Sequence, residues 1–223
     1  MRRPDDPELR QVVAAGLTLG VAVGVFGAVF GVGAVSAGAS VWQACAMSLL
    51  VFTGASQFSA VSVIAAGGST ASALGGAMVL AARNTVYGLT MAQYLGNVGS
   101  LGRRLVASQL VIDETTAITA AQATPRLRSA AFWLTGATLF VCWNAATLLG
   151  AVVGSNIDPQ TYGLDVAFPA GYVAMVAPHF RGPAGRLAGL LGGVICLALT
   201  PFTPVGVPIL CASAAVLVGV RRR

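Results

Sequence analysis

Residues 47–58 read Met47-Ser48-Leu49-Leu50-Val51-Phe52-Thr53-Gly54-Ala55-Ser56-Gln57-Phe58. Here Gly-Ala-Ser-Gln interrupts an apolar, charge-free segment that extends over roughly 41–66. That segment is long enough to cross a bilayer, which takes about 20 residues. Backbone polar groups freed at mid-depth find no water there, so such a break is tolerated only where it is buried in protein or lines a cavity.

Two interpretations of this break remain open. Broken helices are one way in which transporters build a substrate site at the membrane midplane. Small residues also let a neighbouring helix approach closely, with no role in binding. Under the first interpretation the candidate substrate-binding residues of this stretch are Gly54, Ala55, Ser56 and Gln57.

The composition excludes a soluble protein. Of the 223 residues, 56% are hydrophobic and only 9% are charged, whereas a soluble domain carries about 25% charged residues. We therefore expect an all-α integral membrane protein in the lipid bilayer. The net charge of +6 comes from arginines that concentrate in the terminal tails and short loops, as topology signals and lipid contacts do. No basic run with interleaved aromatic residues indicates nucleic-acid binding.

The four cysteines all fall inside apolar segments and show no metal-ligand spacing, which indicates buried free thiols. The sequence therefore predicts no metal site and no cofactor. It also predicts no enzyme, because an intramembrane hydrolase needs a Ser–His, paired-Asp or metal constellation and no histidine lies within an apolar segment.

Eight apolar segments can be drawn, at about 12–35, 41–66, 71–95, 105–123, 130–153, 162–178, 187–200 and 204–220. The predicted fold is a polytopic bundle of about eight transmembrane helices, some of them broken or short. A single transporter domain, 12–220, would lie between a cytoplasmic N-terminal tail, 1–11, and a basic C-terminal tail, 221–223.

The arginines orient this bundle through their preference for the cytoplasmic side. With eight crossings and both termini in the cytoplasm, only Arg103 and Arg104 of the loop and tail arginines lie outside. A re-entrant second segment would leave only five of these arginines inside. We therefore expect a bacterial inner-membrane protein with cytoplasmic termini and eight crossings. In the first segment, glycines at four-residue spacing predict close helix packing; these are Gly16, Gly20 and Gly24, and then Gly27 and Gly31.

Charged residues stand in the middle of the third and fourth segments. Arg83 and Asn84 are further candidate substrate-binding residues. Arg83 lies near the centre of its segment, where an arginine costs at least ~3 kcal/mol and needs a partner, a wet cavity or a ligand. Asp113 would share a helix face with Gln109 and Thr116. Glu114 would meet a more apolar wall, which suits a group that takes up and releases a proton.

Two other interpretations of these charges remain open. Arg83 could be only the structural ion-pair partner of one acid, or one acid could lie nearer the membrane surface. Asn144, in the fifth segment, predicts an interhelical hydrogen bond. In the sixth segment Pro169 and Gly171 follow Phe168 and predict a second interruption. That segment would match the second if the chain were two four-span halves, although no residue-level repeat relates the halves.

Four motifs together resemble the AzlC family, the large subunits of branched-chain amino acid exporters. They are the interrupted stretch within 43–60, the third-segment motif Arg83 to Gly88, Asp113-Glu114 followed by Thr-Thr-Ala, and Leu164 to Ala170. The resemblance covers about residues 10–200. Departures occur at Ala81, where the family commonly has Asn, and at Asn84, where it has His, which puts substrate specificity in doubt.

The resemblance implies export of branched-chain amino acids across the cell membrane, with a separately encoded small AzlD-type membrane subunit. Arg83 or a half-helix N-terminus would then meet the substrate carboxylate, while Asp113 or Glu114 meets the ammonium or carries a coupling proton. The substrate side chain would lie against Phe52, Phe58 or Phe168. The alternatives are a passive channel, a transporter of another small polar solute, and a scaffold subunit without a site of its own.

Overall fold

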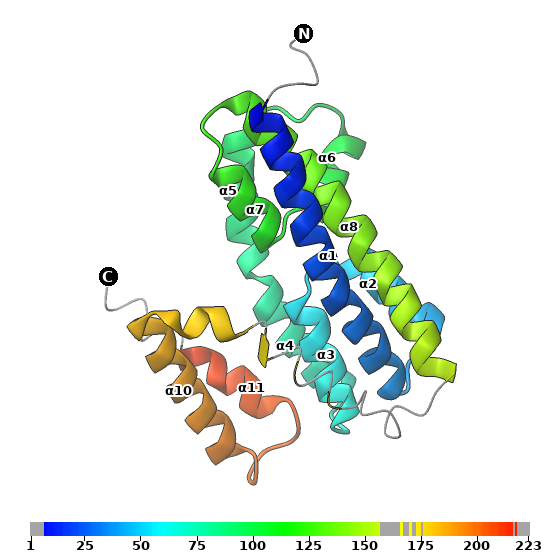
Figure 1. Ribbon diagram of the computed structural model, residues 1–223. Coiled ribbons are helices and arrows are strands. Elements are labelled where there is room, and N and C mark those ends of the chain that lie inside the picture. Colours follow the sequence, from blue (N-terminus) through cyan, green and yellow to red (C-terminus); the bar gives the residue numbers. More distant parts are fainter. Residues whose placement is uncertain are drawn as a thin grey trace.

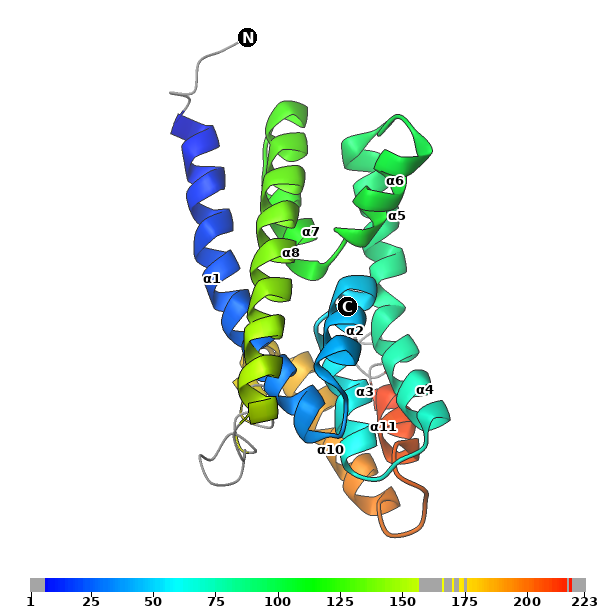
Figure 2. The same cartoon turned by 90° about the vertical axis from the view of Figure 1, so that its right-hand side faces the viewer.

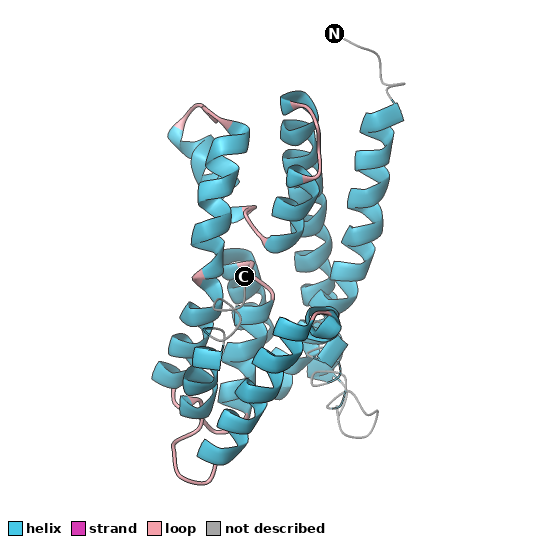
Figure 3. Ribbon diagram, turned by 90° about the vertical axis from the view of Figure 1, so that its left-hand side faces the viewer, coloured by secondary structure: helices cyan, strands magenta, loops and turns pink. Residues whose placement is uncertain are grey.

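The computed structural model describes residues 7–156, 166, 170, 173–174, 176–215 and 217, and the regular structure of these residues is entirely helical (Figure 3). The α-helices are α1 (Pro7–Ser36), α2 (Val41–Val51), α3 (Ala55–Ala65), α4 (Thr70–Ala81), α5 (Arg83–Leu95), α6 (Leu101–Gln109), α7 (Asp113–Ala120), α8 (Pro125–Asn156), α10 (Pro183–Leu199) and α11 (Val207–Ala212). Two short 3-10 helices are η1 (Ala177–Arg181) and η2 (Ser213–Ala215).

The frame of the bundle is a parallel pair formed by α1 and α8 (Figure 1). These two helices are long and apolar enough to cross a membrane. Glycines let their backbones touch: a Cβ at Gly16 would meet Thr135, and a Cβ at Gly27 would lie 2.7 Å from the Trp143 carbonyl oxygen. Later residues of α1 contact later residues of α8, so the two helices run in the same direction. The predicted packing role of the spaced glycines is confirmed.

Segment 41–66 is interrupted, as the sequence predicts, but it does not cross the bundle. α2 rises from the end at which α1 terminates, and α3 returns to that end (Figure 2). Gly54, between them, has φ +56°, a left-handed conformation that favours glycine. The two short helices form a helical hairpin whose tip lies in the middle of the bundle.

Segment 105–123 is also interrupted, which the sequence analysis did not predict. α6 descends from the opposite end of the bundle, residues 110–112 leave the helix, and α7 returns to the end from which α6 came (Figure 2). The chain therefore holds two helical hairpins that enter from opposite ends. Together they replace two of the predicted crossings.

Between the hairpins, α4 and α5 form one nearly continuous crossing, because Ala82 at their junction keeps right-handed helical dihedrals. This crossing runs opposite to α1 and α8 (Figure 2). The guanidinium of Arg128, in the first turn of α8, lies 4.5 Å from the ring centroid of Tyr94, near the last turn of α5. The end of α5 therefore meets the start of α8.

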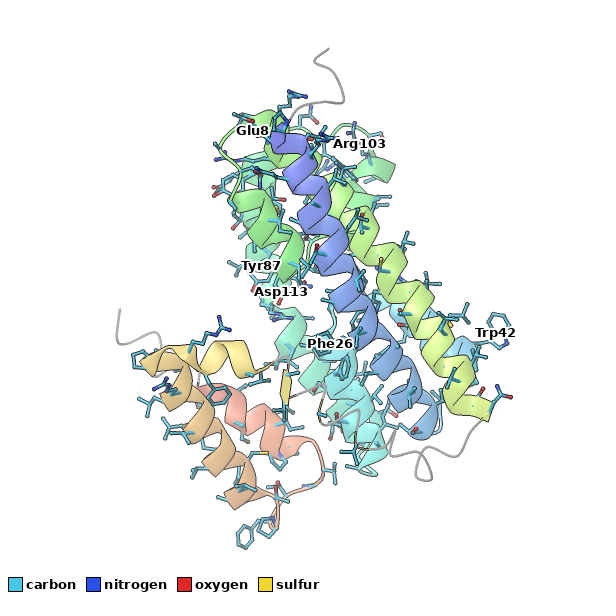
Figure 4. All side chains as sticks on the ribbon, in the orientation of Figure 1. Glu8, Phe26, Trp42, Tyr87, Arg103 and Asp113 are labelled. Carbon is cyan, nitrogen blue, oxygen red and sulfur yellow. The ribbon has the colours of Figure 1, made fainter. Side chains whose placement is uncertain are left out.

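This topology corrects the predicted placement of the arginines. Arg103 and Arg104 begin α6 at the same end as the start of α1, as the labels of Glu8 and Arg103 show in Figure 4. We call this the arginine end; it carries Arg10, Arg103, Arg104, Arg126 and Arg128. The prediction that Arg103 and Arg104 lie opposite the N-terminus is wrong, because the second and fourth segments turn back. The predicted count of about eight crossings is not confirmed.

Large apolar side chains point outward from the crossing helices. Val21 of α1 is 70% exposed, Met78 of α4 71% and Val141 of α8 64%. Such a surface is unfavourable in water and suits contact with lipid. The core beneath it is aromatic: Phe30 lies 5.9 Å from Phe58 and 6.0 Å from Trp143 between ring centroids. The Cβ position of Gly75 in α4 lies 3.4 Å from Leu210, so α11 packs against this crossing.

We expect Gly27→Ala to destabilise the protein by about 1–3 kcal/mol, because its methyl group would collide with the backbone of α8. Gly24→Ala is the matched control, since a Cβ there would lie 3.6 Å from its nearest neighbour, in ordinary contact. Thermal unfolding of both purified variants in detergent would measure the difference. Equal melting temperatures for the two variants would contradict close backbone contact at Gly27.

Candidate functional site between two helical hairpins

The tips of the two hairpins meet in the middle of the bundle. Gln109, at the end of α6, donates through Nε2 to the carbonyl oxygens of Leu49 at 2.8 Å and Leu50 at 3.3 Å, near the end of α2. The last carbonyls of a helix have no partner within the helix. Gln109 therefore satisfies groups of one hairpin from the other and joins the two tips.

Gln57 holds the first tip together. The backbone N–H groups of Thr53 and Gly54 donate to Gln57 Oε1 at 3.3 and 3.1 Å, and Gln57 Nε2 donates to the Met47 carbonyl oxygen at 3.3 Å. The Ser56 hydroxyl is hydrogen-bonded to that of Thr53. Gln57 and Ser56 are fully buried. In this conformation both side chains bridge the break, whereas Gly54 and Ala55 are half-buried.

Thr115 has the same role in the second tip. Its hydroxyl donates to the carbonyl oxygen of Leu110 at 2.6 Å, and the N–H of Ile112 donates to that hydroxyl at 3.1 Å. Thr115 is fully buried. The Leu110 carbonyl and the Ile112 N–H therefore keep hydrogen-bond partners where the chain leaves the helix, as the interior of a membrane protein requires.

The charged residues lie where these elements begin. Arg83 starts α5 and Asp113 starts α7, and Arg83 Nη1 lies 3.2 Å from Asp113 Oδ2. Figure 4 shows Asp113 close to Tyr87, one turn further along α5. The side chains of Arg83 and Asp113 remain 31% and 38% exposed, so the ion pair is accessible rather than sealed. The structure thus brings together two of the residues that the sequence singled out.

Glu114 lies beside this ion pair and interacts electrostatically with both Asp113 and Arg83. The prediction that Asp113 faces a polar partner is confirmed, although Gln109 is on a different helix because the segment breaks between them. Acids in the first turn of α7 also suit the positive end of its helix dipole. Arg83 Nε and Thr116 Oγ1 are buried without a hydrogen-bond partner among the described residues.

The interrupted stretch lies at the level of Arg83. α3 and α4 run antiparallel, and a Cβ at Gly76 of α4 would lie 3.2 Å from Ser59 Oγ of α3. The start of α3 lies four residues before Ser59, and the junction of α4 with α5 lies six residues after Gly76, in the same direction along the bundle. Gly54 and Arg83 therefore occupy one level of the bundle.

A cavity of about 600 Å³ lies between α5 and α6. Asn84 and Thr85 line it next to Arg83, and Arg104 lines it at the arginine end. Asn84 is thus the cavity-lining residue that directly follows Arg83 in the sequence. Among the described residues no group of three His, Cys, Asp or Glu side chains could hold a metal ion.

The aromatic residues expected near a substrate are placed differently. Phe58 is fully buried against Phe30 and Trp143, and Phe52 is buried with its ring 5.0 Å from that of Phe140. Phe168 lies outside the described residues, as does the predicted interruption at 169 and 171. The predicted interhelical bond of Asn144 is confirmed, because Ser48 Oγ donates to Asn144 Oδ1 at 2.7 Å.

Two features of the site escaped the sequence analysis. Gln109 was considered only as a neighbour of Asp113, and the break at 110–112 carries no glycine or proline. Its signal is the run of two acids and two threonines from Asp113 to Thr116, since acids and hydroxyl side chains favour a helix start over a helix interior.

Comparison with known proteins places the chain in a family. The family model described as AzlC protein matches residues 18–157, more than half of the chain. The chain belongs to the AzlC family. This confirms the resemblance seen in its motifs, and the match covers both hairpins and the Arg83–Asp113 pair.

Two curated relatives of this AzlC-family chain come from Helicobacter pylori. The protein of strain ATCC 700392 / 26695 is 26% identical over 180 residues, which cover 78% of each chain. That of strain J99 / ATCC 700824 is 25% identical over 158 residues, 69% of this chain and 68% of the relative. Both are described as uncharacterized membrane proteins. No solved structure matches the chain.

We expect Gln109→Leu to destabilise the protein by about 1–3 kcal/mol, because it leaves the Leu49 and Leu50 carbonyls without a donor. Gln122→Leu is the matched control: Gln122 follows α7, and its Nε2 donates to the Ile118 carbonyl, four residues earlier in the chain, at 3.0 Å. The measurement is thermal unfolding in detergent. An unchanged melting temperature for Gln109→Leu would show that the tips do not depend on this contact.

Proposed function

We propose that this protein is the large subunit of a secondary transporter that exports branched-chain amino acids. The observation that carries the proposal is the accessible Arg83–Asp113 ion pair, with Glu114 beside it, at the level where two interrupted helices meet. Charges inside a membrane segment are costly and mark substrate or proton pathways. Membership of the AzlC family supports a transport-related role in a membrane.

The ion pair suits a zwitterionic substrate. A guanidinium binds carboxylates through directional, charge-assisted hydrogen bonds, and the Arg83 side chain, paired with Asp113 through Nη1, remains 31% exposed. Asp113 then loses its partner and becomes available for the substrate ammonium. We favour Arg83 over the N-terminus of α3 because a guanidinium carries a full positive charge, whereas a helix N-terminus is equivalent to about half of one.

Glu114 is the proposed coupling group. It interacts with both members of the ion pair, so a change in its protonation changes the balance of charge that holds Arg83. Uptake of a proton by Glu114 on one side and its release on the other would link substrate movement to the proton gradient.

The remaining proposals concern the surroundings of the site. A small AzlD-type membrane subunit would complete the exporter, as the resemblance implies. The protein would lie in the bacterial inner membrane with the arginine end in the cytoplasm, because basic residues concentrate on that side. The C-terminus is also proposed to be cytoplasmic.

Three rival functions make different predictions. A passive channel would give a flux that neither saturates nor follows the proton gradient. A transporter of another small polar solute would leave leucine and valine untransported, with or without the partner. A scaffold subunit would tolerate the loss of Arg83. The ion pair argues against the scaffold, because charges inside a membrane segment are costly and mark functional sites.

We expect Arg83→Ala to lose the efflux of preloaded labelled leucine or valine from cells that also express an AzlD-type partner. The reason is that the substitution removes the proposed carboxylate contact and frees Asp113. Arg10→Ala, an exposed arginine in the first turns of α1, is the control and should retain efflux. The wild type and both variants must be present in the membrane in equal amounts. Wild-type efflux from Arg83→Ala would remove the ion pair from the substrate site.

We expect Glu114→Gln to abolish the response of efflux to an imposed proton gradient, because an amide, unlike a carboxyl group, does not take up and release a proton. The measurement compares efflux with and without the gradient in membrane vesicles, for wild type and variant. Glu8→Gln, which makes the same change at an exposed position in the first turn of α1, is the control for loss of a carboxyl and should respond as wild type does. A gradient response that survives in Glu114→Gln would assign coupling to another group.

A further inference from the structure

The two hairpins are copies of one sequence pattern. Residues 48–60 read SLLVFTGASQFSA and residues 108–120 read SQLVIDETTAITA. Each residue of the second stretch lies 60 positions after its counterpart, as Ser108 does after Ser48. The two stretches share the first serine, the Leu-Val pair at 50–51 and 110–111, and the final alanine. Phe is replaced by Ile at two further positions, and Ser by Thr at two others. The repeat was not apparent between the halves of the chain because its period is shorter than half the chain.

The same period relates the surrounding helices. α2 and α6 begin 60 positions apart, at Val41 and Leu101. Asn84, in the crossing α4–α5, corresponds to Asn144 in the crossing α8. The two hairpins enter from opposite ends of the bundle (Figure 2). The chain therefore contains an inverted-topology repeat, the architecture in which transporters place a substrate between repeat-related elements.

The repeat relates two interfaces between helices, which we call seams: that of α2 with α8 and that of α6 with α5. The two seams differ in their contacts. At the seam between α2 and α8, Ser48 is fully buried and its hydroxyl lies 2.7 Å from Asn144 Oδ1 and 3.2 Å from Thr147 Oγ1. At the seam between α6 and α5, the counterparts Ser108 and Asn84 line opposite walls of the 600 Å³ cavity. There the Ser108 hydroxyl donates within its own helix, to the Arg104 carbonyl at 2.9 Å.

We propose that the α5–α6 cavity is the substrate passage to Arg83 from the arginine end. The α2–α8 seam is then the repeat-related passage to the opposite end, closed in this conformation. This inference rests on the proposed transport function. Closure of α6 onto α5 would bring Ser108 to Asn84, and opening of α2 would release Ser48 from Asn144. One hydrogen bond of the same kind is exchanged for another, which keeps the two states close in energy.

The lining of the cavity defines the class of solute that it admits. Arg104 at the arginine end attracts an anionic group, Asn84 and Thr85 offer hydrogen bonds near Arg83, and Met91 and Leu95 form an apolar wall. A small amphiphilic zwitterion, such as an amino acid with an apolar side chain, matches all three surfaces. An inorganic ion would leave the apolar wall unused.

Gln109 couples the two passages. It belongs to α6, which lines the cavity, and it bonds the carbonyls at the end of α2, which forms the closed seam. Movement of α6 toward α5 therefore pulls on the tip of α2. α1 and α8 touch through their backbones and provide the fixed frame against which both hairpins move.

The test uses cysteine labelling and cross-linking in membrane vesicles. Cys45, Cys142, Cys196 and Cys211 are first replaced by alanine. Gly88→Cys is placed in the cavity wall, where a Cβ meets no neighbour within 4 Å. Gly102→Cys, equally unobstructed and at the arginine end, reports which vesicle side that end faces. The probe is a membrane-impermeant maleimide, added to vesicles of either orientation.

We expect the maleimide to modify Gly88→Cys from the same side as Gly102→Cys. Adding the pair Asn84→Cys and Ser108→Cys and oxidising it should close the cavity, reduce modification of Gly88→Cys at least tenfold and leave Gly102→Cys unaffected. Oxidising the pair Ser48→Cys and Asn144→Cys should leave modification of Gly88→Cys unchanged. Reduction of the disulfide should restore accessibility in the first case.

These readouts need no substrate, so they remain decisive if leucine and valine are not transported. Absence of modification from the arginine side, or modification that ignores the 84–108 cross-link, would overturn the passage. Efflux is the second readout, with each double variant compared with itself before and after oxidation. Efflux that persists through a complete 48–144 cross-link would overturn the proposed opening of that seam.

Discussion

The structure depends on one constraint: every backbone group released by a helix break in the bundle interior must find a partner inside the protein. Two breaks lie there, and each is closed by a buried side chain of its own hairpin, Gln57 in one case and Thr115 in the other. Gln109 then satisfies the end of α2 from the facing tip. These bonds satisfy backbone groups at both breaks, and the charges at 83, 113 and 114 lie together beside them.

The position of those charges follows from the same breaks. Asp113 is the first residue of α7, and Arg83 follows the junction at which α4 continues into α5. The α4–α5 junction and the second hairpin therefore present opposite charges to each other at one level. The α1–α8 pair contributes no charge to this level, and α8 packs against both hairpins, through α2 and α7.

The sequence predicted the composition of this site better than its topology. The break at Gly54 was evident because glycine and serine stand out in an apolar run, and Arg83 and Asp113 because charges are rare there. The turn of each hairpin was not evident, since a segment of about 25 apolar residues has the length of a crossing whether or not it reverses. Reversal is decided by tip contacts such as Gln109 with Leu49, which join residues far apart in sequence. That error also put Arg103 and Arg104 on the wrong side.

The parallel pairing of α1 with α8 governs when the protein can fold. The two helices are separated in sequence by both hairpins, so their contact closes a long loop and forms only after α8 has been synthesised. Until then α1 lacks the surface on which its glycines pack, and the polar tips have no frame around them. The nascent chain must therefore hold two unshielded hairpins during insertion, which makes residues 125–156 the segment whose arrival commits the bundle to its native arrangement.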